Sequence, residues 1–404
     1  MPTAPAAVSS ATDALDAADR RFGWHPFTQM REYLDNPRLH LVRGEGSWLI
    51  DGEGKRYLDG NASVWTNVHG HNDPDLNRAL REQLEQVAHV TLLGLNHPVA
   101  TGLAEDLAGL TGGALPRCFF TDNGSNAVEV ALKLSFQYWQ LVGQDAKRGV
   151  ISMEGAYHGD TFGTMAVGER SEFHRRFTPW LFPARTFPAP VHSECAGQVE
   201  RSDATASLAA LEALLVREAA TTACVILEPR VQGAAGMVQQ PAGFVKSVAA
   251  LCRKHGVHLI LDEVFTGFGR VGSLTVAEAE GVVPDFLCLA KGLAAGYLPL
   301  AATLTSERIH EAFLGKFSEG RTFFHGHTFS GNPLGCAVAR ASLRKLRHML
   351  ASGQVAERAA LLGREMQAAF AGHAHVRAYR QLGDRKSTRL NSSHTDISRM
   401  PSSA

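Results

Sequence analysis

The sequence predicts an α/β protein whose sheet is mostly parallel and covered by helices. Short apolar runs, typical of strands buried on both faces, alternate along the chain with longer helical stretches. Such alternation favours parallel strands joined by helical crossovers. With 404 residues and 45% hydrophobic content, the chain is long enough for a large domain and a smaller one.

The elements follow in a regular order. A hairpin is expected first, with short strands at 47–50 and 55–58 around the turn DGEG. A helical pattern starts at Asp75. Beyond it the sequence predicts the strands of the main sheet and the helices between them: strands 117–121, 148–153, 223–229, 257–264 and 285–291, and helices 126–142, 203–220 and 241–256.

Composition excludes several classes of protein. Lys+Arg and Asp+Glu are both 40, so no net charge favours nucleic acid or an anionic membrane as a partner. No run approaches the roughly 18 apolar residues of a membrane span, and the N-terminus does not have the pattern of a secretory signal. Six scattered cysteines indicate reduced thiols and a cytoplasmic location. The pairs His69/His71 and His325/His327 are weak metal signals, and no metal is expected.

Lys291 is the one charged group after Asp285 in the run DFLCLAKGLAAGYLPLAATL. A charge in such a setting is costly unless it is paired or neutralised, and a neutral amine is a nucleophile. A lysine whose ammonium reaches solvent from a strand end is the structural alternative. Asp262 lies near the carboxyl end of another predicted strand, where it either serves a ligand or caps a helix; Glu263 and Glu228 are alternatives of the same kind.

Two further stretches follow predicted strands. Gly124 and Ser125 open a helix and would present N–H groups and a hydroxyl to a phosphate, although helix capping alone also explains them. Tyr157 in GAYHGDT could lie flat on a ring or simply pack. Carboxyl ends of parallel strands meet at one sheet edge. A lysine, a carboxylate, a phosphate seat and an aromatic face together are what pyridoxal phosphate requires.

The sequence resembles the class III (ω-amino acid) aminotransferases of pyridoxal phosphate fold type I. The motifs that carry the resemblance are LILDEVFTGFGRVG, AKGLAAGYLPL with Lys291 placed 29 residues after Asp262, EPRVQGAAGM and HGHTFSGNPLGCAVA. Within the class, WHPFTQM, DGNASVWTNVHGH and GAYHGDT are most similar to the branch that acts in biotin synthesis. The resemblance covers about residues 24 to 383.

The resemblance implies a homodimer with the active site at the subunit interface and pyridoxal 5'-phosphate as cofactor. Lys291 would hold the cofactor covalently and move the proton, and Asp262 would pair with the pyridine nitrogen. The other implied site residues are Gly124, Ser125 and, from the partner subunit, Thr328 for the phosphate, with Tyr157, Trp65 and Phe27 at the ring and substrate.

The implied reaction transfers an amino group to 8-amino-7-oxononanoate to give 7,8-diaminononanoate. S-adenosylmethionine and lysine remain open as donors, because Phe27 stands where users of S-adenosylmethionine commonly have tyrosine. Another ω-aminotransferase, acting on a diamine or an ω-amino acid, is one alternative. An inactive, truncated chain that binds only the cofactor is another.

The same resemblance implies a division into domains. We expect a loose N-terminal arm over 1–22, parts of a small domain over 23–74 and 336–383, and a large cofactor domain over 75–335. The small domain is expected to be C-terminally incomplete and to lack the arginine that binds the substrate carboxylate. Residues 384–404 are polar, contain KSTRLNSSH and resemble a foreign read-through peptide, so we expect a disordered, non-native tail there.

Overall fold

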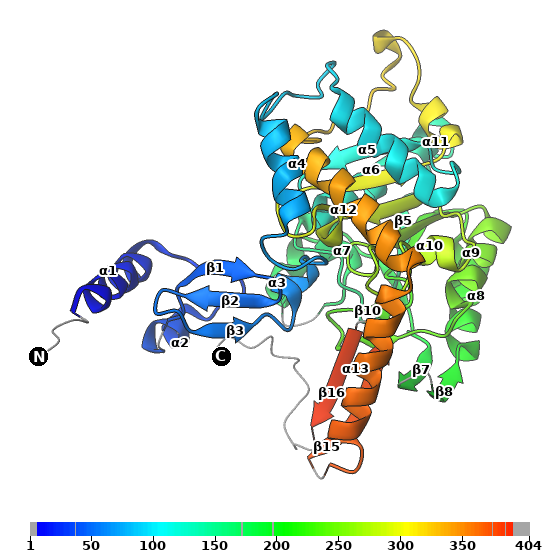
Figure 1. Cartoon of the computed structure of the whole chain (residues 1–404). Coiled ribbons are helices and arrows are strands. Elements are labelled where there is room, and N and C mark those ends of the chain that lie inside the picture. Colours follow the sequence, from blue (N-terminus) through cyan, green and yellow to red (C-terminus); the bar gives the residue numbers. More distant parts are fainter. Residues whose placement is uncertain are drawn as a thin grey trace, which may run out of the picture.

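A seven-stranded sheet forms the centre of the computed structural model (Figure 1). The structure describes residues 6–36, 38–170, 173–195, 198–373, 375–383 and 385–390. In spatial order the strands of the central sheet are β4 (Arg117–Thr121), β14 (Ala301–Thr305), β13 (Phe286–Leu289), β12 (His258–Asp262), β9 (Thr222–Leu227), β5 (Gly149–Met153) and β6 (Arg185–Phe187).

The strand directions confirm the predicted α/β class with a mostly parallel sheet. β14 is antiparallel to both of its neighbours, β13 and β4, whereas the pairs from β13 to β6 are all parallel. The strands β14 and β6 were not predicted from the sequence. The carboxyl ends of β4, β5, β9, β12 and β13 therefore lie at one edge of the sheet.

Helices cover both faces, as the apolar strands require. Alternate residues point to opposite faces: Leu259 and Leu261 of β12 pack in one buried cluster, and Ile260 between them packs in another. The first cluster is closed by α5 (Pro98–Ala108), α8 (Thr205–Glu218), α9 (Phe244–His255) and α12 (Pro333–Ala351). The second is closed by α6 (Gly124–Leu141), with contributions from α7 (Phe162–Val167) and α11 (Glu307–Ala312).

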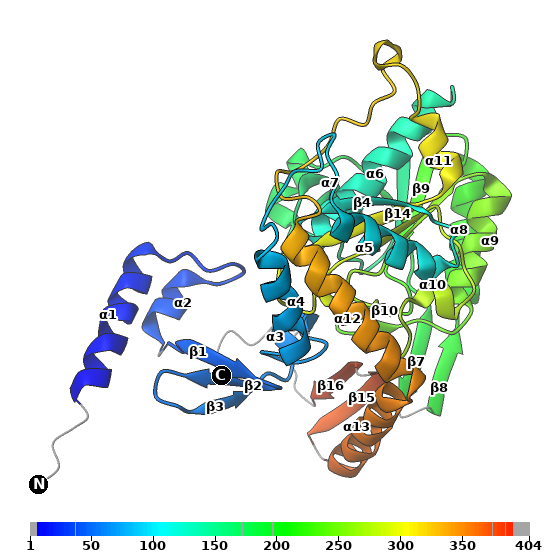
Figure 2. The same cartoon turned by 45° about the horizontal axis from the view of Figure 1, so that its top comes forward.

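A small N-terminal unit stands beside this body (Figures 1 and 2). Its three-stranded antiparallel sheet consists of β1 (Leu41–Glu45), β2 (Trp48–Asp51) and β3 (Arg56–Leu58). The predicted hairpin corresponds to β2 and β3, and β1 is an additional strand. The helices α1 (Ala6–Phe22) and α2 (Met30–Asp35) lie next to this sheet.

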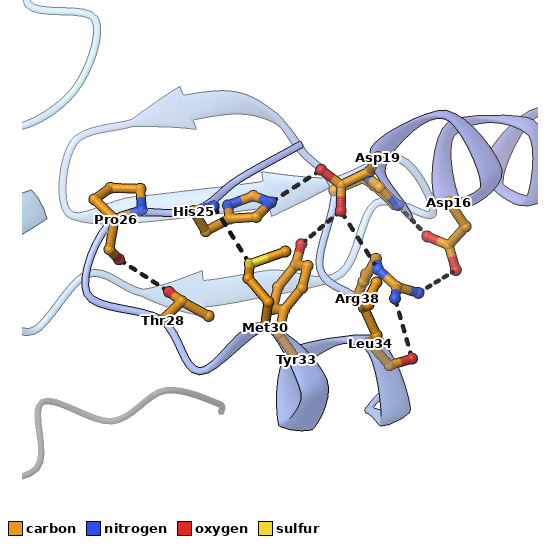
Figure 3. Close-up of polar contacts among 10 residues, drawn as sticks. Asp16, Asp19, His25, Pro26, Thr28, Met30, Tyr33, Leu34 and Arg38 are labelled. Atoms are coloured by element: carbon orange, nitrogen blue, oxygen red, sulfur yellow. Dashed lines mark hydrogen bonds and ion pairs between the residues drawn. The ribbon is translucent and has the colours of Figure 1, made fainter. Parts of the chain in front are cut away.

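The N-terminal segment 1–22 was expected to be a loose arm, but residues 6–22 of it form the helix α1. Asp19 on α1 accepts a hydrogen bond from the Tyr33 hydroxyl at 2.9 Å and pairs with His25 at 2.9 Å (Figure 3). Arg38 pairs with Asp19 at 3.4 Å and with Asp16 at 3.5 Å, and His40 also pairs with Asp16. Four polar side chains that come later in the sequence thus hold the helix. Polar contacts of this kind leave no apolar period, so the sequence did not predict them.

The C-terminal part differs from the expected division in two ways. The boundary expected at 335/336 falls inside α12, whose Cys336, Leu343 and Leu346 belong to the large buried cluster. After α13 (Gln354–Phe370), β15 (Val376–Leu382) pairs with β16 (Arg385–Leu390), a separate sheet from β1–β3. The two segments that were expected to form the small domain, 23–74 and 336–383, therefore do not share one sheet in the described chain.

The strand β16 also corrects the expectation of disorder for the first residues of the tail. Its ladder with β15 runs from Leu382–Arg385 to Val376–Leu390. Ladder hydrogen bonds join backbone groups, so a polar sequence can form them without an apolar pattern. The rest of the proposed foreign tail, 391–404, lies outside the described residues.

The remaining elements are short. They are α3 (Ala62–Trp65), α4 (Pro74–Leu84), α10 (Val276–Ala279), β7 (Val191–Cys195), β8 (Gln198–Asp203), β10 (Val231–Gln232), β11 (Val238–Gln239) and the 3₁₀ turns η1 (Gly109–Thr111), η2 (Arg175–Trp180), η3 (Lys291–Ala294) and η4 (Phe317–Glu319). Within the part of the chain that the structure describes, no helix is both long and apolar enough to cross a membrane.

Candidate active site

A cavity of about 730 Å³ opens at the carboxyl edge of the central sheet. This volume is within the range of small-molecule sites. Its lining brings together six of the residues singled out from the sequence: Trp65, Gly124, Ser125, Tyr157, Asp262 and Lys291. They come from segments more than two hundred residues apart in sequence, and the fold brings them together around one cavity.

Lys291 lies just beyond β13 and opens the turn η3. The strand ends at Leu289, two residues earlier than the predicted 285–291. The lysine backbone has a φ of 44°, a left-handed conformation that is costly for a residue with a side chain and is found most often at functional sites. Its Nζ lies 4.9 Å from the ring centre of Trp65 and 5.9 Å from that of Phe265, so two aromatic faces border the amine.

Asp262 is the last residue of β12 and is almost fully buried. Its Oδ2 lies 2.7 Å from Nδ1 of His158, and its Oδ1 accepts a hydrogen bond from the Val264 N–H at 3.1 Å. The other ring nitrogen of His158 has no hydrogen-bond partner among the described residues. His158 and the Val264 N–H therefore contact different oxygens of the carboxylate and together fix its orientation. The sequence did not predict this role for His158.

The structure separates Asp262 from the two alternative carboxylates. Glu263 points away from the cavity, where it accepts hydrogen bonds from Val276 N–H and Ala277 N–H at the start of α10. Glu228 does line the cavity but accepts from the N–H groups of Tyr157 and Gly233. Burial raises the pKa of Glu228 and that of Glu263 to about 7. Asp262 is the one of the three that pairs with a histidine.

The raised pKa of Glu263 predicts a dependence of stability on pH. Because the folded-state pKa of about 7 exceeds the ordinary value of 4.5, the folded chain binds the proton more tightly, and stability is lost as pH rises through that interval. A shift of this size corresponds to about 3 kcal/mol. We expect Glu263→Gln, which cannot ionise, to show a smaller decrease in urea midpoint between pH 5 and pH 8 than the parent chain.

The control for this experiment is Glu365→Gln, which changes an exposed glutamate on α13. Its decrease between the two pH values should equal that of the parent. A Glu263→Gln variant with the parent's full decrease would contradict the assignment of this pH dependence to Glu263.

Gly124 and Ser125 form a polar cradle at the start of α6. The Thr161 N–H donates to Ser125 Oγ at 3.1 Å, and the Thr164 hydroxyl lies 3.0 Å from the same oxygen. A Cβ added at Gly159 would lie 2.3 Å from Ser125 Oγ, so only glycine lets the chain pass so close to it. The N–H groups at this helix start and the hydroxyls around Ser125 are donors suited to a phosphate.

Tyr157 borders the cavity with its ring nearly parallel to that of His174, at a centroid distance of 5.9 Å. Its hydroxyl donates to Asp160 at 2.8 Å. Burial and this hydrogen bond raise the pKa of the hydroxyl, so Tyr157 stays protonated. Trp65 also lines the cavity and packs against Phe265, with a centroid distance of 4.6 Å.

Two of the predicted site residues lie elsewhere in this chain. Phe27 is 66% exposed and borders a separate hollow with Trp24 and Phe173. Thr328 is exposed on the loop before α12 and does not line the cavity. In the part of the chain that the structure describes, His, Cys, Asp and Glu form no group suited to a metal ion.

Several residues that contact the predicted site residues were not predicted from the sequence. His158 was not among the predicted site residues, although its place directly after Tyr157, just past a strand, was a usable signal. Thr161 and Thr164 reach Ser125 only because α7 packs beside α6. Phe265 lies against Trp65, from which it is two hundred residues distant in sequence. Such contacts depend on tertiary packing.

Comparison with known proteins identifies the class. The profile of the family described as aminotransferase class-III matches residues 30–396, and this chain belongs to that family. The match runs into the segment 384–404 that was expected to be foreign.

More specific likenesses point to one branch of the family. The adenosylmethionine-8-amino-7-oxononanoate aminotransferase of Geobacter sulfurreducens is 49% identical over 82% of this chain and 74% of its own length. A crystal structure of the enzyme of the same name from Methanocaldococcus jannaschii superposes with a TM-score of 0.86 at 37% identity, covering 94% of this chain and 84% of that one. An amine transaminase from an uncultivated Pseudomonas species, in PLP-bound form, gives a TM-score of 0.80 at 34% identity, over 89% and 82% of the two chains.

Proposed function

We propose that this chain uses pyridoxal 5'-phosphate to transfer an amino group to 8-amino-7-oxononanoate, giving 7,8-diaminononanoate in biotin synthesis. The observation that carries the proposal is the meeting of Lys291, Asp262, Tyr157 and Ser125 in one cavity. Relatives named for this reaction, up to 49% identical, support the choice of substrate. The buried His158–Asp262 pair and the donors around Ser125 fit the two ends of the cofactor.

When bound, pyridoxal phosphate supplies an electron sink that stabilises the carbanion formed as an amine loses its α-proton. Lys291 Nζ would bind the cofactor aldehyde and carry the proton to and from the reacting carbon. The Asp262 carboxylate, oriented by His158, would accept a hydrogen bond from the pyridine N–H. The ring of Tyr157 would lie on the cofactor, the Gly124 and Ser125 donors would hold the phosphate, and Trp65 would border the substrate.

The homodimer remains part of the proposal. Thr328 of the partner subunit would complete the phosphate site, and Phe27 would contribute to the substrate pocket. Several large apolar side chains near Thr328 in sequence are exposed in the single chain, among them Phe317 (80%), Phe324 (73%) and Phe329 (59%). Exposed apolar groups that are close in sequence to an expected site residue support an interface between copies of the chain. We also propose a cytoplasmic location, because Cys118, Cys224, Cys252, Cys288 and Cys336 are free thiols.

The donor is tested by offering S-adenosylmethionine and lysine separately to the chain loaded with cofactor. A change in the visible absorbance of the cofactor with one donor identifies it, and the diamine product is then sought by mass spectrometry after 8-amino-7-oxononanoate is added. We expect S-adenosylmethionine to react, because the similar enzymes carry it in their names. Turnover of simple amines without reaction of 8-amino-7-oxononanoate would favour another ω-aminotransferase. No reaction with any donor would favour an inactive chain.

A further inference from the structure

The turn that carries Trp65 has an unusual backbone. Ala62, Ser63, Val64 and Trp65 all have positive φ angles, of 53°, 48°, 62° and 71°. Ser63 and Val64 have ψ angles of 57° and 48°, so the chain makes a left-handed helical turn. Residues with a Cβ avoid this conformation, and β-branched valine does so especially. Four such residues in succession persist only if the surroundings hold them there.

Two side chains hold the turn: Asn61 Oδ1 accepts from the Val64 N–H at 3.3 Å, and the carboxylate of Asp59 makes the shorter contacts. Its Oδ1 accepts from the Ser63 N–H at 2.9 Å and its Oδ2 accepts from the Ser63 hydroxyl at 2.7 Å. The same Oδ2 lies 2.8 Å from Nε2 of His71, and the Asp59 side chain is only 7% exposed. The backbone of His71 exchanges two hydrogen bonds with Gly46, directly after β1. One carboxylate therefore ties the turn to the edge of the N-terminal sheet.

The end of the turn is fixed against the cavity. Trp65 packs on Phe265, and a Cβ added at Gly233 would lie 3.4 Å from the tip of the indole. The Trp65 ring centre is 4.9 Å from Lys291 Nζ. If the turn relaxed to right-handed or extended angles, the direction of the chain at Trp65 would change, and the indole would leave this position.

We propose that Asp59 is a positioning residue that, by holding Ala62–Trp65 in the left-handed turn, keeps the Trp65 indole over Lys291. The placement of the indole stands on the geometry alone; its consequence for substrate rests on the proposed function. Asp59 does not line the cavity; its side chain contacts Ser63 in the turn and His71 beside the N-terminal sheet.

The test uses Asp59→Ala and the matched control Asp51→Ala. Asp51 is a second buried carboxylate of the N-terminal unit; it accepts from the N–H groups of Glu53 and Lys55 and from the Tyr57 hydroxyl, and none of these partners belongs to the turn Ala62–Trp65. Trp65 emission is obtained as the difference between each variant and its Trp65→Phe counterpart, in protein without cofactor. We expect acrylamide quenching of Trp65 to rise about twofold in Asp59→Ala, as a locally released segment becomes accessible, and to stay unchanged in Asp51→Ala.

Restoring the turn by another route separates positioning from general stability. Val64 is 42% exposed, and glycine adopts its left-handed angles without a steric penalty. We expect Val64→Gly to return the quenching of Asp59→Ala to near the parent value. Val42→Gly, at an exposed valine of β1, should not. Equal quenching in the Asp59 and Asp51 variants, or no rescue by Val64→Gly, would overturn the proposal.

Kinetics with the loaded enzyme then test the link to substrate. Loss of a contact that binds ground state and transition state alike raises KM and leaves kcat nearly unchanged. We expect Asp59→Ala to raise the KM for 8-amino-7-oxononanoate about tenfold, the effect of losing one such contact. Increased quenching with an unchanged KM would support the positioning role of Asp59 and contradict the placement of substrate at Trp65 in the proposed function.

Discussion

Lys291→Ala is expected to abolish both the covalent attachment of pyridoxal phosphate and nearly all transamination. Lys291 is the one lysine that lines the cavity in the described chain, and its amine lies beside Trp65 and Phe265. Removal of the group that moves the proton alone costs about 10²–10⁴ in rate, and loss of the covalent link adds to this. Borohydride reduction followed by peptide mapping should find the cofactor mass on the Lys291 peptide of the parent chain and nowhere in the variant.

The matched control for that experiment is Lys316→Ala, an exposed lysine in the loop before η4. It should keep the colour, the labelled peptide and the activity of the parent. If the Lys291 variant still carried reducible cofactor, the nucleophile would be another lysine, and the assignment of this cavity as the active site would be wrong.

Asp262→Asn should decrease kcat about 10²–10³-fold, the range found when one preorganised electrostatic partner is removed from an active site. An asparagine preserves the shape of the side chain and can still contact His158, but it lacks the negative charge that would stabilise a protonated pyridine nitrogen. Glu263→Gln removes a neighbouring buried carboxyl whose oxygens are occupied by Val276 and Ala277, away from the cavity. We expect it to lower kcat less than tenfold.

These two variants are compared by steady-state kinetics at saturating cofactor, with circular dichroism to establish that each is folded. Similar losses in both would mean that the carboxylate was assigned to the wrong residue. A loss confined to the apparent affinity for cofactor, with kcat restored at high concentration, would make Asp262 a binding group without a role in the reaction.

Much of the fold was predictable because burial on both faces imposes a strong pattern on a strand. The runs RCFFT and VHLILDEV contain β4 and β12, and the helices predicted at 126–142 and 241–256 contain most of α6 and α9. β14 was missed because its sequence, AATLT, continues the apolar run after Lys291, and Gly296 and Pro299 within that run were not taken as the start of a new strand. β6, with three residues, is too short to show a period.

The site was predictable in its residue types and less so in its geometry. The rule that ligands bind at the carboxyl ends of parallel strands was enough to bring Lys291, Asp262, Tyr157 and Ser125 together. The same rule could not choose between Asp262 and Glu263, because adjacent residues at a strand end point to opposite sides and only the packed neighbours show which side is the cavity. Glu228 follows another strand and also lines the cavity, and only its hydrogen bonds to Tyr157 N–H and Gly233 N–H distinguish it from Asp262.

By itself the sequence determined five of the seven strands of the central sheet and the main helices between them, which edge of the sheet carries the chemistry, and which lysine is placed there. These properties follow from local periodicity and from the polarity of parallel strands. Only the tertiary structure decided that His158 holds Asp262, that Asp59 holds the turn beneath Trp65, and that α1 is anchored by Arg38 and Tyr33. Hydrogen bonds and ion pairs between distant polar residues leave no period in a sequence, because each depends on where two separate segments are brought together in space.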